Sequence, residues 1–404
     1  MLRYIVDEVA LTRNLEILAS VRECAGVKIL LAQKAFSCFE LYPLVAKYLD
    51  GATASGLFEA RLAHEEMPGK ENHVFAPAFR AEDMPELLRV VNHIVFNSSR
   101  QVEKFGEMAR AAGVSVGLRV NPEVSVATTP AYDPCRPGSR LGVTRGELDA
   151  VWGGWQFTAT DDSDAINCVP PVADAQERVP PATDAQERVP PIDGLHFHCL
   201  CEQGVEELRK VLAGFEAKFG DLLPRMKWVN FGGGHHITRK DYHRDQLVEL
   251  LNNFKARYPH LEVIMEPGEA IGWQTGELVA NVVDLVHNEM DIAILNVSVS
   301  AHMPDCLEMP YRPNVTGADL PGVKKFTYKL TGNTCLAGDQ LGDFSFDKPL
   351  QVGDQIIFED MIHYTMVKTT FFNGVRHPNI GMFDMDGKFH LLHEFTYEQF
   401  KEKL

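Results

Sequence analysis

Four kinds of residue that can act together in catalysis each follow an apolar, strand-like run of this sequence. Lys34 comes directly after one run, where lost hydration lowers the pKa of a lysine and prepares it for Schiff-base chemistry. His196 and His198 end a second run, and side-chain alternation along a strand puts both imidazoles on one face. Three glycines, 232–234, follow a third run, and Glu266 ends a fourth.

These features fit one cofactor. A lysine can hold an aldehyde, and a histidine can stack on an aromatic ring. Glycines let backbone amides approach a phosphate because no Cβ intervenes. With a carboxylate added, the four features together predict a pyridoxal phosphate site. Separately, each has an ordinary explanation, such as a solvated lysine or a tight turn.

The elements that would position these residues are short β-rich runs that alternate with amphipathic helical stretches. Eight parallel strands with helical crossovers predict an α/β fold, a (β/α)8 barrel whose catalytic groups lie at the carboxyl ends of the strands. The alternative is a doubly wound open sheet. The predicted strands are 28–33, 51–55, 73–77, 93–97, 114–121, 192–199, 227–231 and 262–266, and the predicted helices are 38–49, 57–66, 84–91, 100–112, 205–219 and 242–258.

The pattern changes near residue 276 to β-rich runs separated by turn signals, which predicts an appended β domain. We therefore expect a pyridoxal-phosphate-binding barrel over 8–272 and a C-terminal β domain over 273–404, joined by a strand from 1–7. A Pro-rich insert near 156–191 carries the repeat VPPVADAQER and VPPATDAQER. Two polar copies cannot build a solenoid core, so an extended, exposed insert is expected.

Composition narrows the class of partner and the compartment. The chain has 404 residues and a formal net charge of -17, which disfavours nucleic acid and anionic membranes as partners and suits a cationic small molecule. No secretory signal or apolar stretch of spanning length is present, and the eight cysteines lack a framework spacing, so a cytoplasmic location is expected. Cys199 and Cys201 have no second pair of ligands nearby, so no metal is expected.

Longer blocks of the sequence resemble the alanine racemase/ornithine decarboxylase group of pyridoxal phosphate enzymes, in which a barrel is followed by a β domain. Within the group the chain is most similar to the carboxynorspermidine/carboxyspermidine decarboxylases. The resemblance covers nearly the whole chain apart from the insert. It is carried by the blocks 30–36, 139–144, 231–235, 238–242, 266–270, 301–305, 307–311, 334–339 and 358–365.

The resemblance implies a role for each residue that matches the motifs of the group. Lys34 would hold the cofactor covalently, and His198 would stack on the pyridine ring. Glu266 would pair with the pyridine nitrogen and keep the ring protonated, which favours decarboxylation; racemases of this fold are expected to have an arginine there. The phosphate would be held by Gly232, Gly233, Gly234 and Tyr364.

Cys335 matches the cysteine that, in the group, enters the site from the partner subunit and serves the protonation of Cα. A thiol suits this step because its pKa lies near the working pH. The resemblance therefore implies a homodimer with the active site at the interface. Asp339, four residues further on, would meet one end of the substrate.

The chain departs from the ornithine decarboxylases beside the predicted phosphate site. Glu269 stands where those enzymes have an arginine, and a negative group there needs a cation, which a secondary ammonium of the substrate would supply. Glu269 and His235 are therefore predicted to contact the substrate, with Asp305 and Glu308 as weaker candidates. Each acidic residue has an ordinary alternative as solvated surface.

The expected activity is pyridoxal-phosphate-dependent decarboxylation of carboxynorspermidine or carboxyspermidine to norspermidine or spermidine. The alternatives are decarboxylation of diaminopimelate, arginine or lysine, and a non-catalytic regulatory protein of the same fold. The sequence does not separate the two carboxylated triamines, because one methylene changes binding only slightly.

Overall fold

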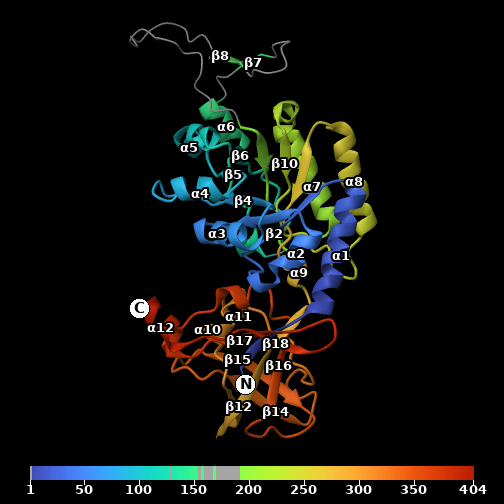
Figure 1. Ribbon diagram of the computed structural model, residues 1–404. Helices are drawn as coiled ribbons and strands as arrows, with labels where there is room; N and C mark the ends of the chain where they lie inside the picture. The colour runs from blue at the N-terminus through green and yellow to red at the C-terminus, as the bar shows by residue number, and fades with distance from the viewer. Residues whose placement is uncertain (1, 128, 153–155, 159–166, 170–191) are drawn as a thin grey trace. The chain divides into compact units, whose positions relative to one another are not determined.

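The computed structural model describes residues 2–127, 129–152, 156–158, 167–169 and 192–404, and Figure 1 labels their helices and strands. The described chain forms two compact units. The barrel unit consists of Leu18–Gln33 and Val45–Pro267. The sheet unit consists of Met1–Ile17, Lys34–Leu44 and Gly268–Leu404.

The barrel unit contains a closed barrel of parallel strands, as the sequence predicts. Its strands follow one another around the barrel in chain order, and β11 closes it by pairing with β2. The strands are β2 (Lys28–Ala32), β3 (Gly51–Ala54), β4 (Glu71–Phe75), β5 (His93–Phe96), β6 (Ser115–Arg119), β9 (Gly194–His196), β10 (Trp228–Asn230) and β11 (Glu262–Met265). All eight agree with the predicted runs to within a few residues at each end.

Helices cover the outside of the barrel strands. Figure 1 shows α3, α4 and α5 on one side of the strands and α7 and α8 on the other. The helices from the N-terminus to the barrel's end are α1 (Glu8–Ala25), α2 (Tyr42–Tyr48), α3 (Leu57–Glu66), α4 (Met84–Val90), α5 (Ser99–Ala111), α6 (Arg145–Trp152), α7 (Val205–Phe219), α8 (Arg244–Arg257) and α9 (Glu269–Gly272). The alternation of strands and helices did not predict α1, which precedes the first barrel strand, or α6, which lies in the long interval that contains the insert.

Trp228 fills the interior of the barrel. It packs with Leu30, Val95 and Ile264, all buried. A Cβ on Gly194 of the neighbouring strand would lie 2.1 Å from the Trp228 ring, so only glycine leaves room for the indole. The barrel is therefore a packed core, and its chemistry is confined to the ends of the strands.

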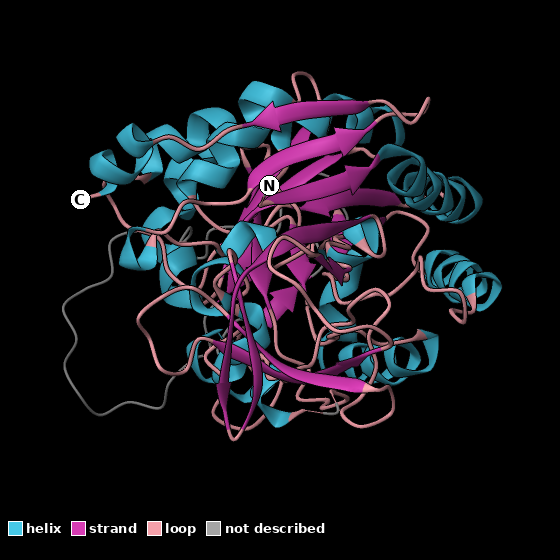
Figure 2. Ribbon diagram, turned by 90° about the horizontal axis from the view of Figure 1, so that it is seen from below, coloured by secondary structure: helices cyan, strands magenta, loops and turns pink. Residues whose placement is uncertain are grey.

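The sheet unit is built on one mixed sheet, whose strands are drawn in magenta in Figure 2. The predicted N-terminal strand joins it: β1 (Arg3–Asp7) pairs antiparallel with β12 and parallel with β17. The sequence did not predict β13, β15 or β17. Besides β1, the strands of this sheet are β12 (Gly276–Asn288), β13 (Met290–Leu295), β14 (Phe326–Thr331), β15 (Gln340–Phe346), β16 (Gln355–Glu359), β17 (Asn379–Phe383) and β18 (Phe389–His393). The unit also has the short helices α10 (Val299–His302), α11 (Asp305–Glu308) and α12 (Tyr397–Lys403).

The two units are not made of the same segments as the two predicted domains. The predicted boundary at 272/273 lies five residues from the start of the segment Gly268–Leu404, and Lys34–Leu44 belongs to the sheet unit although it follows a barrel strand. Most of the predicted insert, 159–166 and 170–191, lies outside the described residues; 156–158 and 167–169 pair as β7 (Gln156–Thr158) and β8 (Asn167–Val169). No helix among the described residues is long and apolar enough to cross a membrane.

Candidate active site

Glu266 lies at the carboxyl end of the barrel strands and is held by side chains from two neighbouring strands. It directly follows β11, and its side chain is buried. Asn230, the last residue of β10, donates a hydrogen bond of 2.7 Å to Oε1. Nε2 of His196, the last residue of β9, lies 3.3 Å from Oε2. Three consecutive strands thus converge on one carboxylate.

These contacts keep Glu266 ionised. Burial opposes ionisation, but the hydrogen bonds from His196 and Asn230 outweigh it and lower the pKa of Glu266 to about 2. A buried carboxylate of this kind is a ready acceptor for the N–H of a protonated pyridine ring. The position and charge of Glu266 fit the predicted role.

The glycine turn after β10 is tied to the same residues. The amide of Gly232 donates to Asn230 Oδ1 and the amide of Gly233 donates to His198 Nδ1, both at 2.8 Å. His198 is thereby fixed with Nδ1 as an acceptor, which leaves its ring proton on Nε2. A phosphate at this turn would be met by Gly234 or would displace one of these two bonds.

Side chains are excluded from the turn by close approach of the backbone. Gly234 has φ +81°, in the left-handed region, and a Cβ there would lie 2.1 Å from the carbonyl oxygen of Leu200. A Cβ on Gly233 would lie 2.4 Å from the carbonyl oxygen of Glu266. The glycines are needed for packing in the structure whether or not their amides hold a phosphate.

Lys34 and Tyr364 lie in the sheet unit and are joined through the backbone. Lys34 is exposed, and the amide of Tyr364 donates to the carbonyl of its neighbour Ala35 at 2.8 Å. Tyr364 has φ 49°, which is uncommon for a residue with a side chain and is typical of functional sites. The predicted cofactor lysine and phosphate ligand are therefore close in the fold.

Glu269 has a cationic partner within the protein. Nδ1 of His363 lies 3.8 Å from Glu269 Oε1, and Nε2 of the same ring lies 3.2 Å from Asp360 Oδ1. Burial disfavours the charged ring, but the contact with Asp360 and the charge of Glu269 raise the pKa of His363. Glu269 thus has a partner within the protein, and its predicted contact with a substrate ammonium stays a prediction.

Asp305 and Glu308 also have a partner. Lys368 Nζ pairs with Asp305 and lies 3.1 Å from Glu308 Oε2, and it is 5.8 Å from the centre of the Tyr364 ring. One lysine thus faces two carboxylates beside Tyr364. The acidic cluster is defined as these four carboxylates with their two cationic partners: Glu269, Asp305, Glu308, Asp360, His363 and Lys368. With His363 protonated, the cluster retains two negative charges.

Asp339, which is predicted to meet one end of the substrate, is buried and hydrogen-bonded in the structure. It is 3% exposed, and Oδ1 accepts hydrogen bonds from Ser298 Oγ and from the amides of Val299 and Ser300 at 2.6–3.2 Å. Oδ2 accepts from the amide and hydroxyl of Thr334 at 3.1 and 2.5 Å. Its role is to attach the turn that carries Cys335 to the start of α10. Cys335 itself is exposed.

Replacing Asp339 by asparagine is expected to destabilise the protein by about 2–3 kcal/mol, because an amide NH2 would face buried N–H donors that lose their acceptor. The loss is measurable as a lower midpoint of denaturant unfolding. Asp347→Asn is the matched control: the side chain of Asp347 is 75% exposed and pairs with Lys324 at 2.9 Å, so a change below about 0.5 kcal/mol is expected. Equal stability of the two variants would contradict the role given to Asp339.

His235 is also buried in the structure. It is 2% exposed, and Nε2 lies 3.4 Å from the carbonyl oxygen of Phe231. Burial lowers the pKa of His235 to about 4 despite backbone hydrogen bonds, so the ring is neutral at neutral pH. The structure shows a buried, neutral ring, and the substrate contact of His235 stays a prediction.

Four residues at the site were not predicted: Asn230, Asp360, His363 and Lys368. Asn230 contacts Glu266 and Gly232 at once. Its place two residues before the glycine turn, on the face that alternation shares with Gly232, was a usable signal. His363 directly precedes Tyr364 within a block that already resembled the group. Its contact with Glu269 joins positions 94 residues apart, so local pattern gives no sign of it.

Comparison with known proteins identifies the family. The family model described as "Pyridoxal-dependent decarboxylase, C-terminal sheet domain" matches residues 4–362. A carboxyaminopropylagmatine decarboxylase of Synechocystis sp. is 43% identical, with 99% of this chain and 94% of that protein covered. A carboxynorspermidine/carboxyspermidine decarboxylase of Campylobacter jejuni is also 43% identical, with 98% and 96% covered.

Solved structures of decarboxylases also match this chain. The carboxynorspermidine decarboxylase from Campylobacter jejuni complexed with norspermidine superposes with a TM-score of 0.83 at 41% identity, covering all of both chains. Diaminopimelate decarboxylase from Helicobacter pylori, at 16% identity and a TM-score of 0.75, shares the fold. The buried carboxylate, the glycine turn and the family model agree, and this chain belongs to the pyridoxal-dependent decarboxylases, enzymes whose cofactor is pyridoxal phosphate.

Proposed function

We propose that this protein decarboxylates a carboxylated triamine, carboxynorspermidine or carboxyspermidine, to norspermidine or spermidine. The observation that carries the proposal is the acidic cluster beside Tyr364, which keeps two negative charges after its own cations are counted. A substrate with several ammonium groups would neutralise it. The Campylobacter jejuni relative, which is 43% identical over nearly the whole chain, acts on carboxylated triamines by name.

Each predicted site residue would have its own role in the reaction. When bound, pyridoxal phosphate supplies an electron sink for the pair of electrons left at Cα as CO2 departs. Lys34 would hold the cofactor through Nζ, and Tyr364 with the 232–234 turn would hold its phosphate. His198 would pack on the ring, with its orientation set by the Gly233 amide. Glu266 would accept the ring N–H and keep it protonated.

Cys335 would complete the reaction by donating its thiol proton to Cα, so that one hydrogen replaces the carboxylate that leaves. Cys335 and its neighbour Leu336 are exposed, which supports a site assembled from two subunits of a homodimer. Asp339 would fix the turn that presents the thiol. We further propose a cytoplasmic location, which the seven free cysteines among the described residues support.

Subunit mixing tests the shared site. Lys34→Ala and Cys335→Ala protein, each inactive or nearly so alone, are expected to recover about one quarter of wild-type activity after random exchange of subunits, because half of the dimers are hybrids with one intact site. The measurement is turnover of the mixture against the two separate variants. If mixing adds nothing, the thiol does not act across the interface.

A second candidate substrate is carboxyaminopropylagmatine, the substrate in the name of the Synechocystis relative. It ends in a guanidinium group, whereas the carboxylated triamines end in a primary ammonium, and the acidic cluster suits either cation. Diaminopimelate, arginine and lysine find less support, because the long structural matches to enzymes of those names are below 25% identity and indicate the fold alone.

The deciding experiment supplies cofactor-loaded enzyme in parallel with carboxynorspermidine, carboxyspermidine, carboxyaminopropylagmatine, diaminopimelate, arginine, ornithine and lysine, and measures the amine released. We expect kcat/KM for a carboxylated triamine to exceed that for every simple amino acid by at least about 100-fold. Preference for carboxyaminopropylagmatine would favour the second candidate. Turnover of a simple amino acid alone would refute both.

A further inference from the structure

Two histidines and a glutamate meet towards the amino-terminal end of the barrel strands, whereas Glu266 follows the carboxyl end. Glu71 and His73 lie on β4, and His93 begins β5. Each offers one ligand atom, and these three atoms all lie within 4.8 Å of one another. Glu71 Oε2 and His73 Nε2 are 3.1 Å apart, close to the spacing of about 3.3 Å between two ligands of a tetrahedral zinc ion.

Each imidazole has one nitrogen that the described residues leave unpaired, whereas Nε2 of His73 already contacts Glu71. His73 is 1% exposed, and Nδ1 of His73 and of His93 are both buried without a hydrogen-bond partner among the described residues. Buried polar atoms of native proteins are nearly always paired, so two such atoms on facing rings require a reason. The rings stack with centroids 4.0 Å apart and planes at 11°.

The charged side chains around the two histidines carry a net negative charge. Lys28 Nζ pairs with Glu71 Oε1 and lies 2.8 Å from Glu262 Oε2. With neutral imidazoles, one lysine faces two carboxylates, which leaves a charge of −1 that a divalent cation would offset. Lys28 occupies the other oxygen of Glu71, so Oε2 remains directed at His73.

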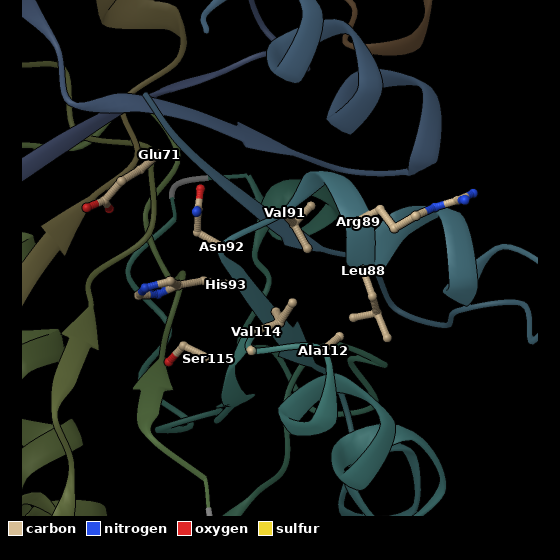
Figure 3. A pocket seen from close by; sticks show the side chains of 10 residues that line it. Glu71, Leu88, Arg89, Val91, Asn92, His93, Ala112, Val114 and Ser115 are labelled. Carbon is tan, nitrogen blue, oxygen red and sulfur yellow. The ribbon is translucent and has the colours of Figure 1, made fainter. Parts of the chain in front are cut away.

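A pocket gives access from solvent. A cavity of about 520 Å³ is lined by Glu71, Asn92, His93 and Ser115, with Leu88 and Arg89 from α4 on its wall. Figure 3 shows Glu71, His93 and Ser115 projecting to one side of the strands, away from Arg89. The pocket is large enough for a water molecule to reach His93 and Glu71, which line it.

We propose that Glu71, His73 and His93 bind a divalent transition metal ion, zinc in the first place, at the amino-terminal end of the barrel. Two imidazoles and one carboxylate form a ligand set that zinc accepts, and a water molecule from the pocket supplies the fourth position. Binding turns the two rings out of their stack so that both lone pairs meet the ion. The site joins β4 to β5 at the end of the barrel that serves stability rather than chemistry, so its role is structural.

The test is a metal titration of tag-free, cofactor-loaded enzyme that has been treated with a chelator. Zn²⁺ binding is measured by calorimetry, and Co²⁺ binding by its visible absorption and by quenching of Trp228, whose ring centre lies 5.1 Å from that of His93. We expect one ion per chain and a higher Tm with Zn²⁺ present. His93→Gln and Glu71→Gln should each weaken binding at least about 100-fold.

His287→Gln is the matched control, because His287 also pairs with a carboxylate, Asp291 at 2.8 Å, but lies exposed in the sheet unit. It should leave the affinity of the site unchanged. Decarboxylation should be the same in all variants, which also shows that each has folded; Glu71→Gln decides the matter if His93→Gln does not fold. The proposal is overturned if wild-type protein binds no ion, or if binding survives both substitutions in folded protein.

Discussion

Lys34→Ala is expected to lose both the cofactor and decarboxylation. The amine of Lys34 is the group predicted to bond to the cofactor aldehyde, and alanine has no nucleophile. After dialysis the variant should lack the visible absorbance of bound pyridoxal phosphate, and turnover should fall by at least about 10⁴-fold because binding and the covalent link are lost together.

Lys47→Ala is the control for this substitution. Lys47 is exposed on α2, so its loss should change neither absorbance nor turnover. Thermal unfolding of Lys34→Ala should match that of the cofactor-free wild type, since Lys34 is itself exposed, and that of Lys47→Ala should match the cofactor-loaded wild type. Turnover by Lys34→Ala near the wild-type rate would exclude Lys34 as the cofactor lysine.

Glu266→Gln is expected to retain the fold and lose most activity. Glutamine has nearly the same shape and can still accept from Asn230, but it carries no charge to hold a proton on the cofactor ring. Loss of one preorganised electrostatic contact lowers kcat by on the order of 10²–10³-fold. KM should change much less, because Glu266 is predicted to contact the cofactor ring and not the substrate.

Glu266→Gln should also change how the stability of the protein depends on pH. The pKa of Glu266 falls from 4.5 to about 2 on folding, so the ionised group stabilises the native state fully above pH 4.5, and this contribution is lost as the pH falls from 4.5 towards 2. Glu266→Gln should therefore lose less stability than wild type over that interval, as measured by thermal unfolding against pH. Parallel curves would mean that Glu266 is not held as a buried anion.

Much of the barrel and part of the site followed from local pattern. Strand runs, crossover stretches and the residues directly after strands are properties of neighbouring positions, so the eight barrel strands were predicted. Glu266 was picked out for the same reason, because the end of a strand is visible in the sequence and parallel strands end at one edge of a barrel.

Contacts between side chains that are distant in the sequence could be identified only from the tertiary structure. Asp339 and His235 are polar residues within blocks that resemble the family, and nothing local indicates that one caps α10 and the other is buried. The contacts of His363 with Glu269 on α9, and of Lys368 with the carboxylates of α11, depend on how separate segments of the sheet unit pack together.

The Glu71, His73 and His93 cluster shows the same division between sequence and structure. Each residue lies on a predicted strand or at its edge, but their proximity depends on the register of β4 against β5, which pairs His73 with His93. Alternation along a strand determines which face a side chain takes, and that much can be derived from the sequence. The register of two strands, the burial of a side chain and the net charge around it depend on contacts throughout the fold. Only the tertiary structure therefore shows which of these side chains lie close together.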